Sequence, residues 1–485
     1  MMQINKKIAY NPYLPGYEYI PDGEPYVFGD RVYIFGSHDE SKSTDFCVGD
    51  YVCWSAPIDN PGNWRYEGVI YKKTQDPMNT DGTHAMFAPD VAVGPDGRFY
   101  LYYGLDFTGK ISVAVCDTPA GKYEFYGMVH FENEDGSERP LTEHIPYDPA
   151  VLVDDDGKVY LYYGFCPHFP IPWVDKSQIK GGMVAELKQD MITIKSLPKS
   201  VLPCFKDSSG TDFENHAFFE ASSIRKINGI YYLVYSSEQI HELCYATSQY
   251  PDKDFVYGGV IISNGDIGYK GRKAEESLCY TGNNHGGLVE IKGQWYIFYH
   301  RHTQATQFSR QGCAEPIRFS EDGSIAQVEM TSCGLNGEPL PADGTYSAYI
   351  ACNLIGPKGT CNLVRKEGLK KTEPYIYEEA YGSKEEERNQ YIANIANGTK
   401  IGFKYFKFEQ KISSIVLSLR GESQGVVKIK LDSIDGVVIG ERTLSLNTDK
   451  WTDVRVDINH VEGTHGIFIE YCGAGIIEVS SFTFE

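Results

Sequence analysis

The chain has 485 residues, of which 66 are acidic and 45 are basic, and its net charge at pH 7 is −21. Such a surface repels nucleic acids and anionic membranes, so the composition argues against both as partners and favours a neutral, polar ligand. The length exceeds the usual size of a single domain, and we expect one large unit and one smaller unit.

The beginning of the chain is polar, and the sequence contains no apolar stretch as long as a signal peptide or a membrane span. Its 12 cysteines are scattered, without CxxC pairs, and several stand inside strand-like runs, which is typical of reduced, buried thiols. Because the number of cysteines is even, disulfides stay open as an alternative. We therefore expect a soluble protein of the cytoplasm.

A short element made of a tight turn and an aromatic-rich strand recurs five times in the first 300 residues. Its tyrosines, at intervals of 67, 60, 72 and 64 residues, are Tyr33, Tyr100, Tyr160, Tyr232 and Tyr296. These intervals fit a four-stranded propeller blade with long loops. Turn sequences such as Asp-Asp-Gly at 155–157 offer the positive φ that hairpins need. Residues 1–350 are therefore predicted to form a five-bladed β-propeller.

A second unit is predicted after the Gly-Pro-Lys-Gly sequence at 356–359, where the repeat has stopped. Alternating apolar and polar residues, as at 428–432 and 466–470, predict strands up to the end of the chain. Residues 356–485 are expected to form a β-sandwich of jelly-roll type. The predicted fold class of the whole chain is all-β.

A polar residue stands ten to twelve positions before each repeat tyrosine. These five residues are Asp22, Asp90, Asp148, Glu220 and His285. Because the first strand of each blade lines the axis of a propeller, we expect them to converge on one cavity. Each alone is compatible with a turn residue or a hydrogen-bonded core histidine. Burying all of them together costs on the order of several kcal/mol, so the set favours a functional site.

Two carboxylic acids facing one bond are what glycoside hydrolysis requires, because one protonates the leaving oxygen and the other takes a proton from water. A further carboxylate nearby raises the pKa of the acid. The aromatic content of 13% suits stacking on sugar rings, although it suits β-structure equally well.

The five repeats, over residues 10–345, resemble glycoside hydrolase family 43, whose members are five-bladed propellers that invert the anomeric carbon. Residues 147–164 are similar to the family segment whose aspartate orients the acid and tunes its pKa, which implies this role for Asp148. Residues 219–236 are similar to the segment that supplies the general acid, which implies Glu220 as the proton donor.

The first repeat resembles the family segment whose aspartate activates water, which implies Asp22 as the general base. The usual Asp-Pro is replaced here by Asp-Gly-Glu-Pro, so Glu24 is the alternative base. The Phe-Ala-Pro-Asp sequence at 87–90 is similar to the family Trp-Ala-Pro-Asp, and it implies that Phe87 and Asp90 belong to an aromatic wall that binds substrate.

Two residues of the fifth repeat complete the resemblance. Arg310 resembles the arginine that reaches the floor of the sugar pocket. His285 matches a histidine that often stands beside a calcium or sodium ion through water, and the net charge of −21 favours a hard cation. We expect calcium near His285 in an electrostatic or structural role, and no organic cofactor.

The C-terminal sequence at 390–405, together with Trp451, resembles carbohydrate-binding modules of family 6. Such modules bind sugars by aromatic stacking, but a domain that only packs on the propeller is an equal alternative.

The sequence thus predicts an inverting, exo-acting glycoside hydrolase that releases terminal α-L-arabinofuranosyl residues from arabinoxylan-derived oligosaccharides. The stretch at 36–40 and the appended sandwich favour arabinose, with a β-xylosidase or a bifunctional enzyme as the alternative. A propeller that only binds glycans is the alternative from another class. Inversion requires carboxyls of Asp22 and Glu220 that are about 6.5–9.5 Å apart, against about 5–5.5 Å for retention.

Overall fold

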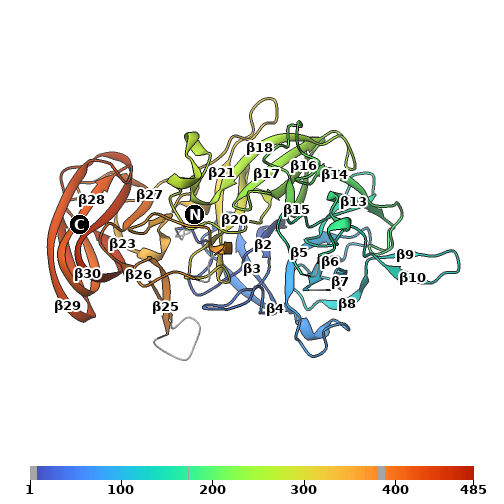
Figure 1. Ribbon diagram of the computed structural model, residues 1–485, viewed down its shortest axis with the longest axis horizontal. Helices are drawn as coiled ribbons and strands as arrows, with labels where there is room; N and C mark the ends of the chain where they lie inside the picture. Colours follow the sequence, from blue (N-terminus) through green and yellow to red (C-terminus); the bar gives the residue numbers. More distant parts are fainter. Residues whose placement is uncertain (1–7, 107, 173, 366–367, 381–387) are drawn as a thin grey trace, which may run out of the picture.

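The computed structural model describes residues 8–485 apart from 107, 173, 366–367 and 381–387. Strands dominate the chain, and the predicted all-β class is confirmed. A propeller and a C-terminal sheet unit lie side by side along the longest axis of the molecule (Figure 1). The described helices are short 3-10 turns: η1 (Lys73–Gln75), η2 (Lys176–Gln178), η3 (Asn264–Asp266), η4 (Tyr269–Gly271), η5 (Ala274–Glu276), η6 (Gly334–Asn336), η7 (Ala348–Ile350) and η8 (Leu363–Arg365).

Five antiparallel sheets form the blades of the propeller, and an outlying hairpin joins β9 (His130–Glu132) to β10 (Glu138–Pro140). Blade I has β1 (Glu24–Phe28), β2 (Arg31–Phe35), β3 (Tyr51–Pro57) and β4 (Arg65–Tyr71). Blade II has β5 (Met86–Val93), β6 (Phe99–Leu105), β7 (Ile111–Cys116) and β8 (Glu124–Met128). Blade III has β11 (Ala150–Val153), β12 (Val159–Tyr163), β13 (Gly181–Leu187) and β14 (Lys199–Pro203). Blade IV has β15 (Phe218–Ile227), β16 (Ile230–Ser237), β17 (Glu242–Ser248) and β18 (Val256–Ser263). Blade V has β19 (Leu288–Ile291), β20 (Gln294–His302) and β21 (Arg310–Ile317).

The repeat tyrosines all lie on the second strand of their blades, and the neighbouring residues explain why this strand is so aromatic. In β12, Tyr160 and Tyr162 face the apolar cluster shared with blade IV, whereas Leu161 and Tyr163 face the cluster shared with blade II. Both faces of the strand are buried, so apolar residues fill every position. Five such clusters, one between each pair of adjacent blades, close the ring.

Blade V has three described strands where four were predicted, and the start of the chain lies against its outer strand. The Asn11 side chain donates hydrogen bonds to the backbone oxygen of Ala314 and to Glu315. The backbone N–H of Tyr13 donates to the oxygen of Gly312. Residues 11–13 therefore fasten blade V to the polypeptide that leads into blade I.

The C-terminal unit is one continuous sheet of nine described strands around its own apolar core. These strands are β22 (Leu340–Pro341), β23 (Gly344–Ser347), β24 (Asn353–Ile355), β25 (Tyr375–Ala380), β26 (Arg388–Ile395), β27 (Lys400–Phe408), β28 (Ser414–Leu431), β29 (Val438–Asp457) and β30 (Gly463–Phe484). Because β22–β24 pair with β27 and β30, the sheet begins at Leu340 and not at the expected residue 356. The Gly-Pro-Lys-Gly sequence is a turn that follows β24 inside this unit.

A buried cation joins the two units. The Lys404 ammonium on β27 is 3.0 Å from a carboxylate oxygen of Asp266 and 2.8 Å from one of Glu329, both from the propeller side. Lys404 and Asp266 are almost completely buried, so this contact is part of the interior of the molecule and not a surface ion pair.

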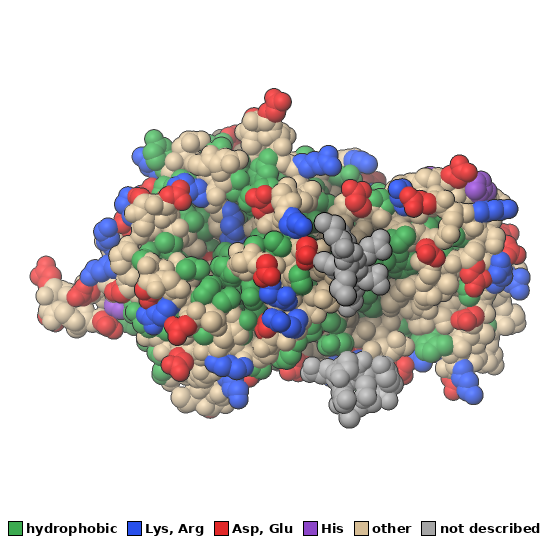
Figure 2. Space-filling view, turned by 180° about the vertical axis from the view of Figure 1, so that it is seen from behind, with side chains coloured by type: hydrophobic (Ala, Val, Ile, Leu, Met, Phe, Trp, Pro, Cys, Tyr) green, Lys and Arg blue, Asp and Glu red, His purple; other side chains and the backbone are tan. Residues whose placement is uncertain are grey.

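The face drawn in Figure 2 carries charges of both signs, and the cysteines are free thiols. On the face drawn in Figure 2, acidic and basic side chains are interspersed. None of the 12 cysteines, all of which the structure describes, forms a disulfide. Within the described residues, every helix is too short or too polar to cross a membrane.

Candidate active site

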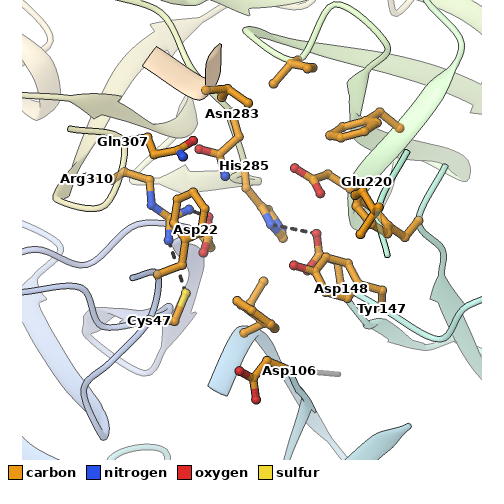
Figure 3. A pocket seen from close by; sticks show the side chains of 18 of the residues that line it. Asp22, Cys47, Asp106, Tyr147, Asp148, Glu220, Asn283, His285, Gln307 and Arg310 are labelled. Carbon is orange, nitrogen blue, oxygen red and sulfur yellow. Dashed lines mark hydrogen bonds and ion pairs between the residues drawn. The ribbon is translucent and has the colours of Figure 1, made fainter. Parts of the chain in front are cut away.

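A pocket of about 330 Å³ lies where the first strands of the blades begin (Figure 3). All five blades contribute to its wall, and its size is that of a small-ligand site. The residues that line it are Asp22, Phe46, Cys47, Phe87, Ala88, Asp106, Tyr147, Asp148, Phe165, Phe169, Ile171, Phe219, Glu220, Ile240, Asn283, His285, Gln307, Arg310 and Val364.

Asp22 is held by its backbone and by its side chain. Its φ of 56° lies in the left-handed region, which is uncommon for a residue other than glycine and requires support from the surroundings. That support comes from His300, whose Nδ1 accepts a hydrogen bond of 3.2 Å from the Asp22 N–H. The other ring nitrogen of His300 lies 2.8 Å from the backbone oxygen of Asn283. This geometry assigns a neutral imidazole that donates through Nε2, and burial keeps the pKa of His300 well below its usual range.

Arg310 keeps a positive charge beside Asp22. Its Nη1 is 3.0 Å from Asp22 Oδ1, while its Nε and Nη2 donate hydrogen bonds of 2.8 and 3.0 Å to the two oxygens of Asp39. The guanidinium carbon also lies 4.8 Å from the centre of the Phe46 ring. Asp39 thus fixes the orientation of the guanidinium and leaves one nitrogen for Asp22, so that a positive charge stays beside the Asp22 carboxyl.

Asp148 and Glu220 come from the adjacent blades III and IV and have raised pKa values. Burial raises the pKa of Glu220 to about 8, and the negative charge of Asp22 adds to this, while Arg310 acts against it. Burial and the charges of Glu220 and Asp22 raise the pKa of Asp148 well above its usual range. Asp148 also accepts a hydrogen bond of 3.0 Å from the N–H of Ala221, so it is tied to the residue after Glu220. Glu220 therefore favours its protonated form at neutral pH, and burial shifts Asp148 in the same direction.

His285 stands between the two sides of the pocket. Figure 3 shows Asp22 and Arg310 on one side, Glu220 and Asp148 on the other, and the imidazole between them. Its Nδ1 is 3.7 Å from Asp148 Oδ2, and its Nε2 is 3.9 Å from Glu24 Oε1. Burial lowers the pKa of His285 to about 4, with a smaller contribution from Arg310, so the ring is neutral at pH 7.

Two residues named from the sequence, Asp90 and Glu24, do not line the pocket. Asp90 accepts hydrogen bonds from the Tyr26 hydroxyl at 2.6 Å and from the N–H of Val151 at 2.7 Å. Glu24 pairs with Arg225 at 2.8 Å. Both carboxylates belong to a buried layer below the pocket, where they join blades, so the structure does not place Asp90 on the pocket wall that was expected for it.

The register of the first strand in blade II explains why Asp90 lies below the pocket and not on its wall. Asp148 and Glu220 lie twelve positions before their repeat tyrosines, but Asp90 lies only ten before Tyr100. Two residues of strand amount to roughly 6.5 Å along the channel. The position equivalent to the two acids is Ala88, which does line the pocket.

Phe87, Arg310 and His285 reach the pocket, and the sequence reasoning missed several of their neighbours. Asp39 acts on Asp22 through Arg310, and His300 contacts Asp22 directly. Cys47, Asn283 and Gln307 line the wall. Asp39 lies in the stretch at 36–40 of the first repeat, which resembles family 43, so the sequence contained an indication of its importance. His300 is inside a strand, and its role emerges only from its contact with the Asp22 backbone.

The structure offers two places with donors for a cation. In blade IV, His216, Glu242 and Cys244 have ligand atoms within 4.8 Å of one another, the one such trio in the described chain, and none of them lines the pocket. Near His285, the buried Glu24 Oε1 has no hydrogen-bond partner. A neutral imidazole and an unpaired carboxylate oxygen are compatible with a hydrated hard cation.

Asp22 beside a cation and Glu220 with a raised pKa face each other across one pocket, and this arrangement permits acid–base cleavage of a glycosidic bond. The fold and the site together define a glycoside hydrolase built on a propeller. Comparison with known proteins gives the particular family. The model of Glycosyl hydrolases family 43 matches residues 21–325, and the chain belongs to this family, as its repeats indicated.

Relatives with printed activities cover the chain to different extents. A "Xylosidase/arabinosidase" of Thermoclostridium stercorarium is 49% identical over 99% of both chains. An "Arabinoxylan arabinofuranohydrolase" of Paenibacillus polymyxa is 26% identical over 95% of this chain and 70% of its own. The crystal structure of a family 43 enzyme from Xanthomonas citri complexed with xylose is 26% identical, with a TM-score of 0.52 over 66% of this chain and 93% of that one. The chain is therefore an enzyme of the xylosidase/arabinosidase group.

Proposed function

We propose that the protein is an inverting, exo-acting α-L-arabinofuranosidase that acts on arabinoxylan-derived oligosaccharides. The observation that carries the proposal is the placement of Asp22, bound to Arg310, and Glu220, whose pKa burial raises to about 8, on opposite sides of one pocket. The relative from Paenibacillus polymyxa, which matches both units, supports arabinose as the released sugar. A pocket walled by all five blades suits the end of a glycan rather than the middle of a chain.

The reaction requires an acid that protonates the glycosidic oxygen and a base that accepts a proton from water. Glu220 transfers its proton to the glycosidic oxygen as the bond from that oxygen to the anomeric carbon breaks. A water molecule attacks the anomeric carbon from the opposite face, and Asp22 accepts its proton. Burial and the negative charge of Asp22 favour the protonated form of Glu220, and Asp148 holds the backbone beside it by accepting a hydrogen bond from the N–H of Ala221. The product sugar leaves with inverted configuration.

A second activity, cleavage of β-xylosides, is favoured by the relative from Thermoclostridium stercorarium, whose printed name combines both. The two sugars differ by the exocyclic hydroxymethyl of arabinofuranose, and one misfit group changes selectivity by about 1–3 kcal/mol. The same acid and base serve either substrate.

Calcium is proposed as a resident ion, with His285 and the free oxygen of Glu24 as the residues that would hold it through water. The ion would supply positive charge next to Asp148 and lower the cost of burying the carboxylates. Dialysis against a chelator should then lower the melting temperature and shift the pH profile of activity. No change in either would contradict the proposal.

The cytoplasm is the proposed location, and the reduced state of 12 cysteines supports it. In that setting the substrates are short oligosaccharides and not polymer. Immunodetection in fractionated cells tests this, and a signal confined to the culture medium would contradict it.

The central experiment compares initial rates on nitrophenyl α-L-arabinofuranoside and nitrophenyl β-D-xyloside, followed by product analysis on an arabinosylated xylo-oligosaccharide. We expect faster cleavage of the arabinofuranoside and release of free arabinose. Proton NMR of the first-formed product should show the inverted anomer. Faster cleavage of the xyloside, release of arabino-oligomers or a retained anomer would each refute the corresponding part of the proposal.

A further inference from the structure

A short segment of the C-terminal unit crosses onto the propeller between β24 and β25. This segment, residues 360–364, is called the strap. The backbone N–H of Thr281 in the propeller donates to Cys361 at 3.1 Å, and the N–H of Leu363 donates back to Thr281 at 2.7 Å. The Thr360 hydroxyl adds a hydrogen bond of 3.3 Å to the backbone of Ser277. The strap is thus fixed on the propeller as if it were part of blade V.

Val364, at the end of the strap, is a residue of the catalytic pocket although it lies outside the propeller sequence. Its backbone N–H is fixed by a hydrogen bond of 2.9 Å to the side chain of Asn362. Its side chain packs against the apolar cluster between blades III and IV, which also contains Phe219 and Ile240. Phe219 and Ile240 line the pocket as well, so the three side chains form one continuous apolar surface.

This surface is on the side of the pocket that holds the acid. Phe219 directly precedes Glu220, and Ile240 comes from the β16–β17 turn of the same blade, where its backbone oxygen accepts a hydrogen bond from Ser236, the strand partner of Glu220. The group that departs from the glycosidic bond must lie next to the acid, because it receives the proton. The apolar surface therefore borders the space of the leaving group, opposite Asp22.

We propose that Val364 is a specificity-determining residue that forms the outer wall of the leaving-group subsite, so that the C-terminal unit completes the active site. The group it contacts is a xylose of the oligosaccharide main chain, whose C–H face packs on aliphatic and aromatic side chains. The inference rests on the proposed function for the identity of this sugar. It does not depend on which pentose is released.

The test compares Val364→Ala and Val364→Thr with Val201→Ala. Val201 packs against the same apolar cluster, but it does not line the pocket, so it is a control for the loss of two methyl groups. Threonine keeps the shape of valine and replaces one methyl group with a hydroxyl, so its effect does not come from a cavity. Each variant is assayed on the nitrophenyl pentoside that the wild type cleaves faster and on an oligosaccharide carrying the same terminal pentose.

Both Val364 variants should raise KM for the oligosaccharide about three- to tenfold, with kcat nearly unchanged, and should raise KM for the nitrophenyl substrate by no more than this, because its nitrophenyl group also lies on the leaving-group side. Inhibition by the free pentose, which occupies only the other side of the bond, should not change, and Val201→Ala should leave every KM within about twofold of the wild type. An unchanged KM for the oligosaccharide in both Val364 variants, or an equal weakening of inhibition by the free pentose, overturns the proposal. Because the pentoside is chosen from the wild-type rates, a preference for xylose contradicts the proposed function without touching this inference.

Discussion

At the scale of single residues, the site depends on charges that are buried and unequal in their surroundings. Asp22 has an arginine and a neutral histidine around it, whereas Glu220 has mainly apolar neighbours and other carboxyls. Two chemically similar groups therefore have opposite electrostatic surroundings, and this difference assigns the roles of acid and base.

The roles can be separated by the leaving group. Glu220→Gln should lose about 10²- to 10⁴-fold in kcat/KM on an oligosaccharide, because its leaving oxygen needs a proton, but much less on a dinitrophenyl glycoside. Asp22→Asn should lose activity on both substrates to a similar extent, since water must be deprotonated in each case. Steady-state kinetics on the two substrates measures this. Equal losses for Glu220→Gln on both would remove Glu220 from the role of acid.

The raised pKa of Glu220 also predicts the pH dependence. The protonated form is active, so kcat/KM should be constant below the pKa of Glu220 and fall as the pH rises through about 8. A profile measured at constant ionic strength tests this, and a basic limb that persists unchanged in Glu220→Gln would show that another group titrates.

At the scale of strands and blades, the ring of five blades could be predicted from the sequence, but some of its details could not. The tyrosine repeat identified the second strand of every blade, because a strand buried on both faces needs apolar residues at each position. Counting back from the repeat tyrosine could not place Asp90, because a difference of two residues along the strand decides whether a side chain lies in the pocket or in the buried layer below it. The short fifth blade and the strap depend on contacts between distant segments, which local patterns do not contain.

The fastening of blade V by the start of the chain is open to a direct measurement. The Asn11 side chain makes hydrogen bonds to Ala314 in both directions and also donates to Glu315 and Thr331, all in the interior. Asn11→Ala leaves these groups unpaired and should cost on the order of 2–4 kcal/mol in the free energy of unfolding.

Urea denaturation checks this, and Asn133→Ala is the matched control, because Asn133 makes its side-chain hydrogen bond within an exposed hairpin. The control should unfold at the urea concentration of the wild type. Equal midpoints for Asn11→Ala and the wild type would show that the ring closes without this contact.

At the scale of the whole molecule, the two units are joined through charge as well as through the strap. Lys404→Met would leave Asp266 buried without its cation, which should destabilise the protein by about 3–5 kcal/mol at neutral pH. The loss should shrink as the pH falls, because burial already raises the pKa of Asp266 and its protonated form needs no partner.

Differential scanning calorimetry at several pH values gives this result directly. Lys407→Met, on the same strand β27 but at the surface, is the control and should change little. A loss of stability for Lys404→Met that stays constant with pH would mean that packing, and not the charge of Asp266, holds the interface.

The ion pair between Arg310 and Asp22 joins residues that are 288 positions apart, in the last and the first blade. On the ribosome, at about 5–20 residues per second, Asp22 emerges roughly 15–60 s before its partner. During that interval blades I and IV expose the apolar faces that blade V later covers. The nascent enzyme is then an open ring without a base held in place, which makes it both inactive and a natural client for chaperones. Catalytic competence therefore cannot precede the synthesis of blade V.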